Sequence, residues 1–134
     1  MAMKLIFGLM FFTCSLCYAE SSLLDVCSPE VVDSQGVYEC SKKKSKEADL
    51  ELNNAYRELN DKVSVDYKAD PLLGDELKSH IKKSQRAWIV LRDENCAIES
   101  FVTPSGTQAF ETSMNYCIAR ESILRVRYLR GLKF

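Results

Sequence analysis

Residues 84–96 read Ser84-Gln-Arg-Ala-Trp-Ile-Val-Leu-Arg-Asp-Glu-Asn-Cys96, and they place the only tryptophan of the chain on a stretch that runs into a cysteine. Apolar residues with the helical period continue this stretch backwards to Leu73, which predicts a long amphipathic helix after Asp70-Pro71. Trp88 lies on the apolar side of that helix. We therefore expect it to pack in the core rather than to bind a partner.

Two other apolar stripes with the helical period predict two more helices. The first occupies Ser41 to about Lys68, a stretch without proline or glycine, and Asp33 or Ser34 is the candidate N-cap if that helix starts earlier. The last follows a turn at residues 104–107 and stops at a glycine. The stripes are Leu52, Tyr56, Leu59 and Val63, then Leu73, Leu77, Ile81, Trp88 and Leu91, then Phe110, Met114, Ile118, Leu124 and Tyr128.

The N-terminus has the three parts of a secretory signal. Lys4 precedes the apolar run of residues 5–12, and a stretch of small and polar residues then ends at Ala19. We expect residues 1–19 to be a signal peptide that is cleaved after Ala19, which leaves residues 20–134 as one domain. The apolar run is too short to span a bilayer, so no membrane span is expected.

The chain has six cysteines, and two of them, Cys14 and Cys17, lie inside the predicted signal. The residues before them do not match a lipoprotein signal, so a periplasmic or secreted protein is favoured over a lipid-anchored one. The other four are an even number in an exported chain, which predicts two disulfides. Pairs that close short segments are favoured, and a pairing across two antiparallel helices remains open. The favoured pairs are Cys27–Cys40 and Cys96–Cys117, and the alternative pairs are Cys40–Cys96 and Cys27–Cys117.

The composition argues against several functional classes. Residues 20–134 carry 17 basic and 19 acidic side chains, a balance that does not favour nucleic acid as a partner. No cysteine pair has zinc-site spacing and His80 lies far from the cysteines, so we expect no metal and no cofactor. No side chains form a catalytic arrangement, since even Asp93 and Glu94 point about 100° apart on a helix. We expect no enzymatic activity.

The three stripes bury one another only if the helices pack together. This predicts an all-α fold, a small antiparallel bundle of three main helices cross-linked by two disulfides. The arginines of the last helix are expected to make structural contacts rather than to form a binding patch. They are Arg120, Arg125, Arg127 and Arg130, and Arg120 is a candidate ion-pair partner of Asp93 or Glu94.

Several blocks of the chain follow the order and spacing of a known family. The blocks are Cys40, Asp49-x-x-Leu52-Asn53-x-x-Tyr56-x-x-Leu59, residues 84–96, Ser105-Gly-Thr and Cys117-x-x-Arg120-x-x-x-Leu124. This pattern resembles the LprI-like lysozyme-inhibitor domain family over nearly all of residues 20–134. The chain departs from the family at Glu121-Ser122 and Arg125, where a threonine and a second arginine are usual. It also has Ser105-Gly106 in place of a glycine pair.

The resemblance implies a small exported helical domain that binds lysozyme or another cell-wall hydrolase. A lysozyme cleft works with two carboxylates, and a rigid domain can block such a cleft by inserting a loop. The candidate loop is Ala97 to Gln108, which a Cys96–Cys117 disulfide would stiffen. Its candidate contact residues are Phe101, Thr103, Ser105 and Thr107.

Two other functions remain open at this stage. The domain is also consistent with a structural or accessory protein of the cell envelope, which a large exposed apolar patch would favour. The third candidate is an immunity protein against a cell-wall-degrading toxin delivered by a competitor. In each case the partner is a protein.

Overall fold

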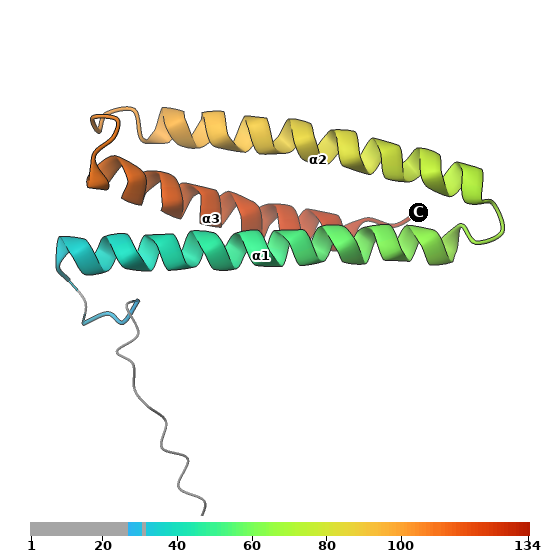
Figure 1. Ribbon diagram of the computed structural model, residues 1–134, viewed down its shortest axis with the longest axis horizontal. Helices are drawn as coiled ribbons and strands as arrows, with labels where there is room; N and C mark the ends of the chain where they lie inside the picture. Colours follow the sequence, from blue (N-terminus) through green and yellow to red (C-terminus); the bar gives the residue numbers. More distant parts are fainter. Residues whose placement is uncertain (1–26, 31) are drawn as a thin grey trace, which may run out of the picture.

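The computed structural model of the chain describes residues 27–30 and 32–134. The predicted signal peptide, its cleavage after Ala19 and the question of a lipid anchor lie outside these residues. The described part contains three helices and no strand, and each helix runs opposite to the one before it, so that α1 and α3 point the same way (Figure 1). This confirms the predicted all-α bundle. The helices are α1 (Ser34–Asp66), α2 (Pro71–Glu99) and α3 (Gln108–Gly131).

Each helix begins after a residue whose side chain caps its first turn. Asp33, Asp70 and Thr107 accept hydrogen bonds of 2.9, 3.2 and 3.2 Å from the backbone N–H three residues later. Asp33 was one of the two predicted caps of the first helix. Pro71 occupies the first position of α2. A backbone N–H at this position has no acceptor within the helix, so proline, which lacks an N–H, costs no hydrogen bond there.

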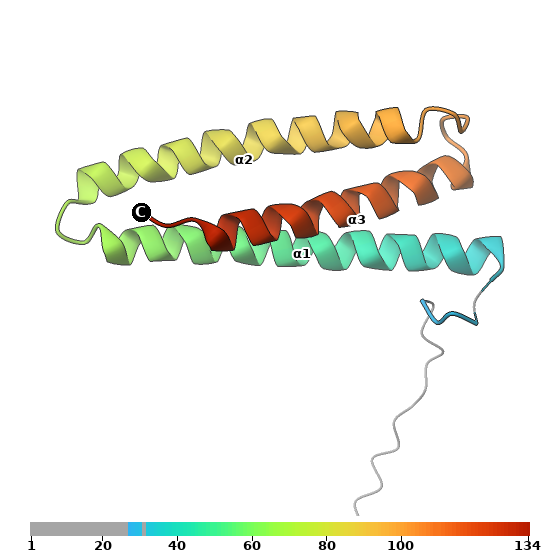
Figure 2. The ribbon, with the colours of Figure 1, turned by 180° about the vertical axis from the view of Figure 1, so that it is seen from behind.

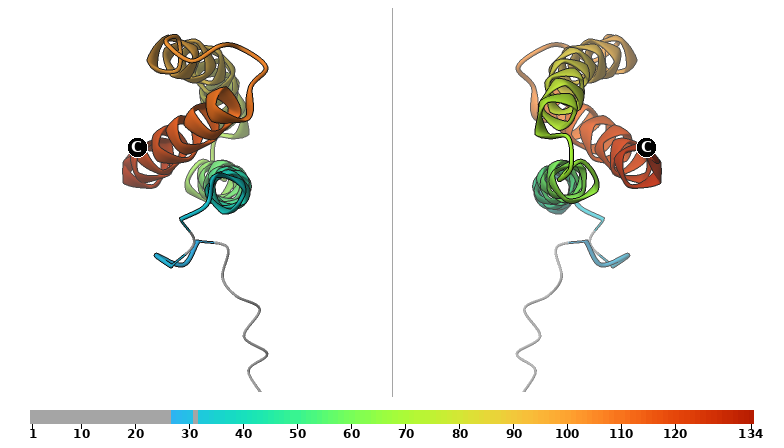
Figure 3. Two further views of the ribbon diagram at one scale, coloured as in Figure 1. Left: turned by 90° about the vertical axis from the view of Figure 1, so that its left-hand side faces the viewer. Right: turned by 90° about the vertical axis from the view of Figure 1, so that its right-hand side faces the viewer.

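The three helices do not pack equally. α3 packs mainly on α1, whereas α1 and α2 have the least contact with each other. Figures 2 and 3 show α3 running at an angle to the other two helices. In the first turn of α2, a Cβ on Gly74 would lie 3.0 Å from the Cβ of Tyr67, so a larger residue would push the end of α1 away by a few tenths of an ångström and this close approach favours glycine.

The apolar core lies in the half of the bundle nearer to the turn between α1 and α2. The stripe predicted for α1 is confirmed, because Leu52, Leu59 and Val63 are buried and Tyr56 packs against them. Trp88 is half-buried beside this cluster rather than enclosed in it. The buried cluster consists of Leu52, Ala55, Leu59, Val63, Ile81, Val126 and Leu129.

The predicted stripes of α2 and α3 are wrong at several positions. Leu73, Leu91, Leu124 and Tyr128 are each about half exposed. The inner positions are taken instead by small or polar residues, because closely packed helices need small side chains and because a buried polar group is tolerated when it is hydrogen-bonded. The buried residues are Gly74, Ile81, Gln85, Arg92 and Cys96 in α2, and Cys117, Ala119, Ser122, Val126 and Leu129 in α3.

The other half of the bundle is held by disulfides and buried hydroxyls. Cys27–Cys40 and Cys96–Cys117 both form, which confirms the favoured pairing. The hydroxyl of the buried Ser41 donates to the carbonyl of Tyr38 and accepts from Asn115, over 2.7 and 3.1 Å. Hydrogen bonds from Tyr38 to Glu111 and from Gln108 to Gln35 also tie the first turns of α1 and α3 together. This half depends on polar and covalent contacts.

The helices of the described part do not include one that is both apolar enough and long enough to cross a membrane.

Candidate functional site

The loop that joins α2 to α3 projects from the end of the bundle that carries both disulfides (Figure 1). It comprises residues 100–107, which is shorter than the predicted Ala97 to Gln108, because residues 97–99 complete α2 and Gln108 begins α3. Gly106 has φ of 79°, a left-handed conformation that a side chain would strain. The loop therefore turns sharply just before the cap of α3.

Three contacts fix the base of this loop. The Cys96–Cys117 disulfide joins the last turn of α2 to α3, and both cysteines are buried. The hydroxyl of Ser100, which is 1% exposed, donates to that of Ser113 over 2.9 Å. Arg120 donates to Glu99 over 2.6 Å. The base of the loop is thus held at fixed geometry.

Arg120 does not pair with Asp93 or Glu94 as predicted. It bonds instead to Glu99 and to its neighbour Glu121, and these carboxylates raise the pKa of its guanidinium. Asp93 is the partner of Arg92. The loop end of α2 is thereby joined to α3 by a charged hydrogen bond as well as by a disulfide.

The predicted contact residues of the loop differ in what they can offer a partner. Phe101 is 84% exposed and Ser105 is exposed, whereas Thr103 is half-buried. Thr107 is already used within the chain: its hydroxyl donates to the carbonyl of Pro104 over 2.7 Å and caps α3. Thr107 therefore supports the loop, and Phe101 and Ser105 are the exposed members of the predicted set.

Sequence reasoning missed two apolar neighbours of Phe101. Val102 is 93% exposed and Ile98, in the last turn of α2, is 72% exposed. The three apolar residues within Ile98-Glu-Ser-Phe-Val102 could have suggested this patch, but their exposure depends on where α2 ends. Ile98, Phe101 and Val102 form what we call the loop tip, an exposed apolar group on a fixed support.

A polar network lies next to the inner face of α2. Arg92 is 9% exposed and donates to Asp49 of α1, Asp93 of α2 and the hydroxyl of Ser122 of α3, over 3.2, 2.8 and 3.0 Å. Its guanidinium also lies 5.4 Å from the ring centre of Trp88. One side chain thereby joins all three helices.

Replacing Arg92 with methionine is expected to lower the free energy of unfolding by about 2 kcal/mol, because charged hydrogen bonds are lost and the hydroxyl of Ser122 loses its donor. Asp49 and Asp93 are about half exposed and can return to water, which limits the loss. Urea denaturation measures the effect. The matched control is Arg127→Met, since Arg127 is exposed and has no partner among the described residues. Equal losses in the two variants would contradict this role of Arg92.

The other arginines of α3 mostly make structural contacts, as predicted. Arg125 donates to Gln85 and Ser84, and its partial burial lowers the pKa of its guanidinium. Arg130 bridges Glu51 and Glu58 of α1 and lowers the pKa of the Glu58 carboxyl. These contacts join α3 to α2 and to α1.

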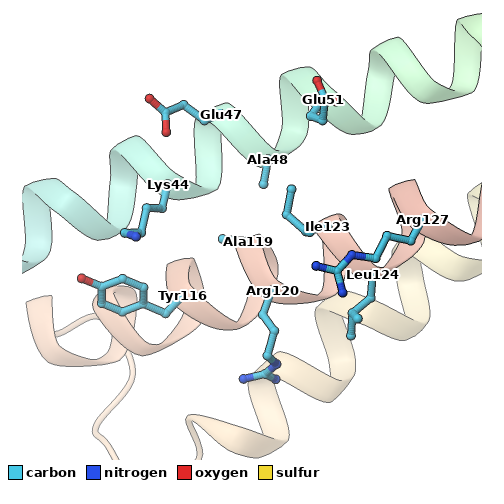
Figure 4. A pocket seen from close by; sticks show the side chains of 10 residues that line it. All are labelled: Lys44, Glu47, Ala48, Glu51, Tyr116, Ala119, Arg120, Ile123, Leu124 and Arg127. Carbon is cyan, nitrogen blue, oxygen red and sulfur yellow. The ribbon is translucent and has the colours of Figure 1, made fainter. Parts of the chain in front are cut away.

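A shallow groove of about 620 Å³ runs between α1 and α3. Figure 4 shows Ala48 facing α3 near Ala119 and Ile123, while the carboxylates of Glu47 and Glu51 point away from the groove. The small alanines let the two helices approach closely. The groove offers apolar surface without a catalytic arrangement.

No group of three or more His, Cys, Asp or Glu side chains within residues 27–30 and 32–134 is placed to hold a metal ion. His80 is exposed on α2. The chemistry that this surface offers is therefore apolar contact, hydrogen bonding and charge.

The fold and the loop define a class: a small helical domain with two disulfides that presents one fixed loop at its end. Residues 27–129 match the model of the family described as Lysozyme inhibitor LprI, and the chain belongs to this family. Membership and the two disulfides indicate an extracytoplasmic protein.

The crystal structure of a DUF1311 family protein (pp0307) from Pseudomonas putida KT2440 is similar to this chain. The two share 31% sequence identity with a TM-score of 0.67, and the match covers 73% of this chain and 91% of that chain. No curated protein matches the chain.

Proposed function

We propose that the protein is an exported inhibitor of lysozyme or of another cell-wall hydrolase, and that it binds its target through the loop of residues 100–107. The observation that carries the proposal is the loop tip, because Phe101 and Val102 are 84% and 93% exposed on a loop whose base is cross-linked. Family membership supports the class of target.

The physical basis of inhibition is the fixed geometry of the loop. Binding energy is lost when a flexible segment must be ordered, and the Cys96–Cys117 disulfide reduces that loss before the target is met. An apolar anchor such as Phe101 can enter the substrate cleft, and the exposed hydroxyl of Ser105 can donate to a carboxylate there. The protein would then exclude the polysaccharide from the two carboxylates that cleave it.

The whole protein without its predicted signal, residues 20–134, tests the proposal when it is mixed with lysozyme and suspended cell walls. Inhibition appears as slower clearing of the suspension. Unchanged clearing at a large molar excess rules out lysozyme as the target. A cell-wall hydrolase that then co-purifies from envelope extracts would identify the protein as an immunity protein, whereas co-purification of other envelope proteins would favour an accessory role.

Phe101→Ala is expected to weaken inhibition about thirtyfold, because a central aromatic contact contributes about 2 kcal/mol or more to binding. The matched control is Leu72→Ala. Leu72 is also 84% exposed, but it lies in the first turn of α2, at the opposite end of the bundle. Inhibition constants measure both effects. Equal weakening by the two substitutions, or none by Phe101→Ala, would contradict the proposed contact.

A further inference from the structure

A polar cleft lies between the middles of α1 and α2, the two helices that have the least contact with each other. Its volume of about 400 Å³ is within the range of pockets that hold small molecules. None of its lining residues belongs to the loop of residues 100–107. The cleft is therefore a separate site. The lining residues that matter here are Asp49 and Tyr56 of α1 and Lys82, Gln85, Arg86 and Arg92 of α2.

The cleft carries an excess of positive charge. Lys82 and Arg86 lie one turn apart on α2, and neither forms an ion pair with a described residue. Arg92 adds a third cation, against the single carboxylate of Asp49 in the lining. That carboxylate already accepts a hydrogen bond from Arg92. Two cations thus remain to attract an anion.

Gln85 provides a hydrogen-bond donor inside the cleft. It is 8% exposed, and its Oε1 accepts a 3.0 Å hydrogen bond from Nε of Arg125. This bond assigns the oxygen, so the amide nitrogen Nε2 is the other terminal atom, and it donates to no described residue. In the described part of the chain no fully buried side-chain nitrogen or oxygen lacks a partner, so Nε2 keeps some exposure, and Gln85 lines the cleft.

The amide nitrogen of Gln85 contributes no hydrogen bond to the fold. The oxygen of this amide is bonded within the protein, whereas its nitrogen has no partner there and is accessible to water. A leucine at residue 85 would extend the apolar stripe above Ile81. The amide nitrogen is therefore left to donate to water or to a ligand in the cleft.

We propose that the cleft binds a small carboxylate that also carries hydroxyl or amide groups, either an acidic sugar or a short acidic peptide. Lys82 and Arg86 pair with the carboxylate, and Nε2 of Gln85 donates a hydrogen bond to the ligand. Asp49, which is about half exposed, and the hydroxyl of Tyr56 bond to the hydroxyl or amide groups. An acidic sugar and a short acidic peptide both offer a carboxylate together with hydroxyl or amide groups.

The test is a titration of the oxidised protein, residues 20–134, followed by NMR at the side-chain amide of Gln85. The probes are D-glucuronate and the dipeptide Ala-Glu, with glucose and Ala-Gln as their uncharged counterparts, all at one ionic strength. We expect at least one acid to shift the Gln85 signal and to saturate below about 10 mM, a weak but specific affinity. Binding of D-glucuronate would indicate an acidic sugar as the ligand, and binding of Ala-Glu would indicate an acidic peptide. The proposal is overturned if neither acid shifts the signal or if an uncharged counterpart shifts it equally.

Substitutions separate specific binding from general charge attraction. Lys82→Gln and Arg86→Gln are each expected to weaken binding about tenfold or more, as for loss of a charged hydrogen bond. Lys83→Gln is the matched control, because Lys83 is exposed, adjacent in sequence and outside the lining. Equal weakening in the control would overturn the proposal.

Gln85→Glu tests whether the carboxylate of the ligand lies beside this amide. A glutamate keeps an oxygen to accept from Arg125 but replaces the free amide donor with a negative charge. Binding, now followed by calorimetry, is expected to be lost while the thermal midpoint of unfolding stays within a few degrees of the parent. Retained binding in this variant would overturn the role of the amide. Inhibition of the hydrolase by the loop should be unchanged, so the two proposals fail independently.

Discussion

Removing the Cys96–Cys117 disulfide by the double substitution Cys96→Ala and Cys117→Ala is expected to weaken inhibition about a hundredfold or more. Without the cross-link, the residues of the loop must be ordered when the target binds, at about 1 kcal/mol for each residue that is newly fixed. The free energy of unfolding should also fall by about 3 kcal/mol, from the loop-entropy relation for a bridge across 21 residues.

The other disulfide is the matched control for this experiment. Cys27–Cys40 spans 13 residues and should contribute a similar stability of about 3 kcal/mol. It does not connect to the loop, so its removal is expected to lower stability and leave the inhibition constant of the folded protein unchanged. Denaturant titrations and inhibition constants, measured where each variant is folded, distinguish the two. If both double variants lose inhibition equally, the disulfide does not act through the loop.

Leu129→Ala is expected to lower the free energy of unfolding by about 3 kcal/mol, because it removes buried methyl groups and leaves a cavity. Leu129 is 2% exposed and packs with α1 in the apolar core. Urea denaturation with an unchanged m-value would measure the loss directly.

Leu124→Ala provides the comparison on the same helix. Leu124 is 48% exposed, although the sequence placed it on the inner face, so its truncation should change stability by less than about 1 kcal/mol. The ratio of the stability losses in Leu129→Ala and Leu124→Ala therefore shows which face of α3 is turned toward the core. A larger loss for Leu124 than for Leu129 would mean that the apolar stripe read from the sequence, and not the arrangement described above, forms the core.

The apolar pattern of the sequence predicts the buried face of a helix correctly where that face consists of large apolar side chains. In α1, Leu52, Leu59 and Val63 are the most apolar periodic residues, and all three are buried. In α2 the inner face includes Gln85 and Arg92, which are recognisable as inner residues only once their partners on α1 and α3 are known. An apolar pattern cannot predict such positions, because their burial depends on hydrogen bonds between distant residues.

The same distinction applies to the candidate sites. The disulfide pairing and the place of the loop followed from spacing and from a proline-glycine turn, which are local signals. The role of Thr107 as a cap and the pairing of Arg120 with Glu99 required the positions of the helix ends. The cleft between α1 and α2 has no sequence signal, since Lys82 and Arg86 look like any solvated helix face.

The uneven distribution of apolar residues also has a consequence for maturation. The half of the bundle near the turn between α1 and α2 has an apolar core that can form in a reduced chain, whereas the half that carries the loop is held by Cys27–Cys40, Cys96–Cys117 and buried hydroxyls. The cross-links at the loop-bearing end therefore require oxidation, whereas the apolar core does not. If the loop acts as proposed, its dependence on Cys96–Cys117 would confine full activity to an oxidising compartment.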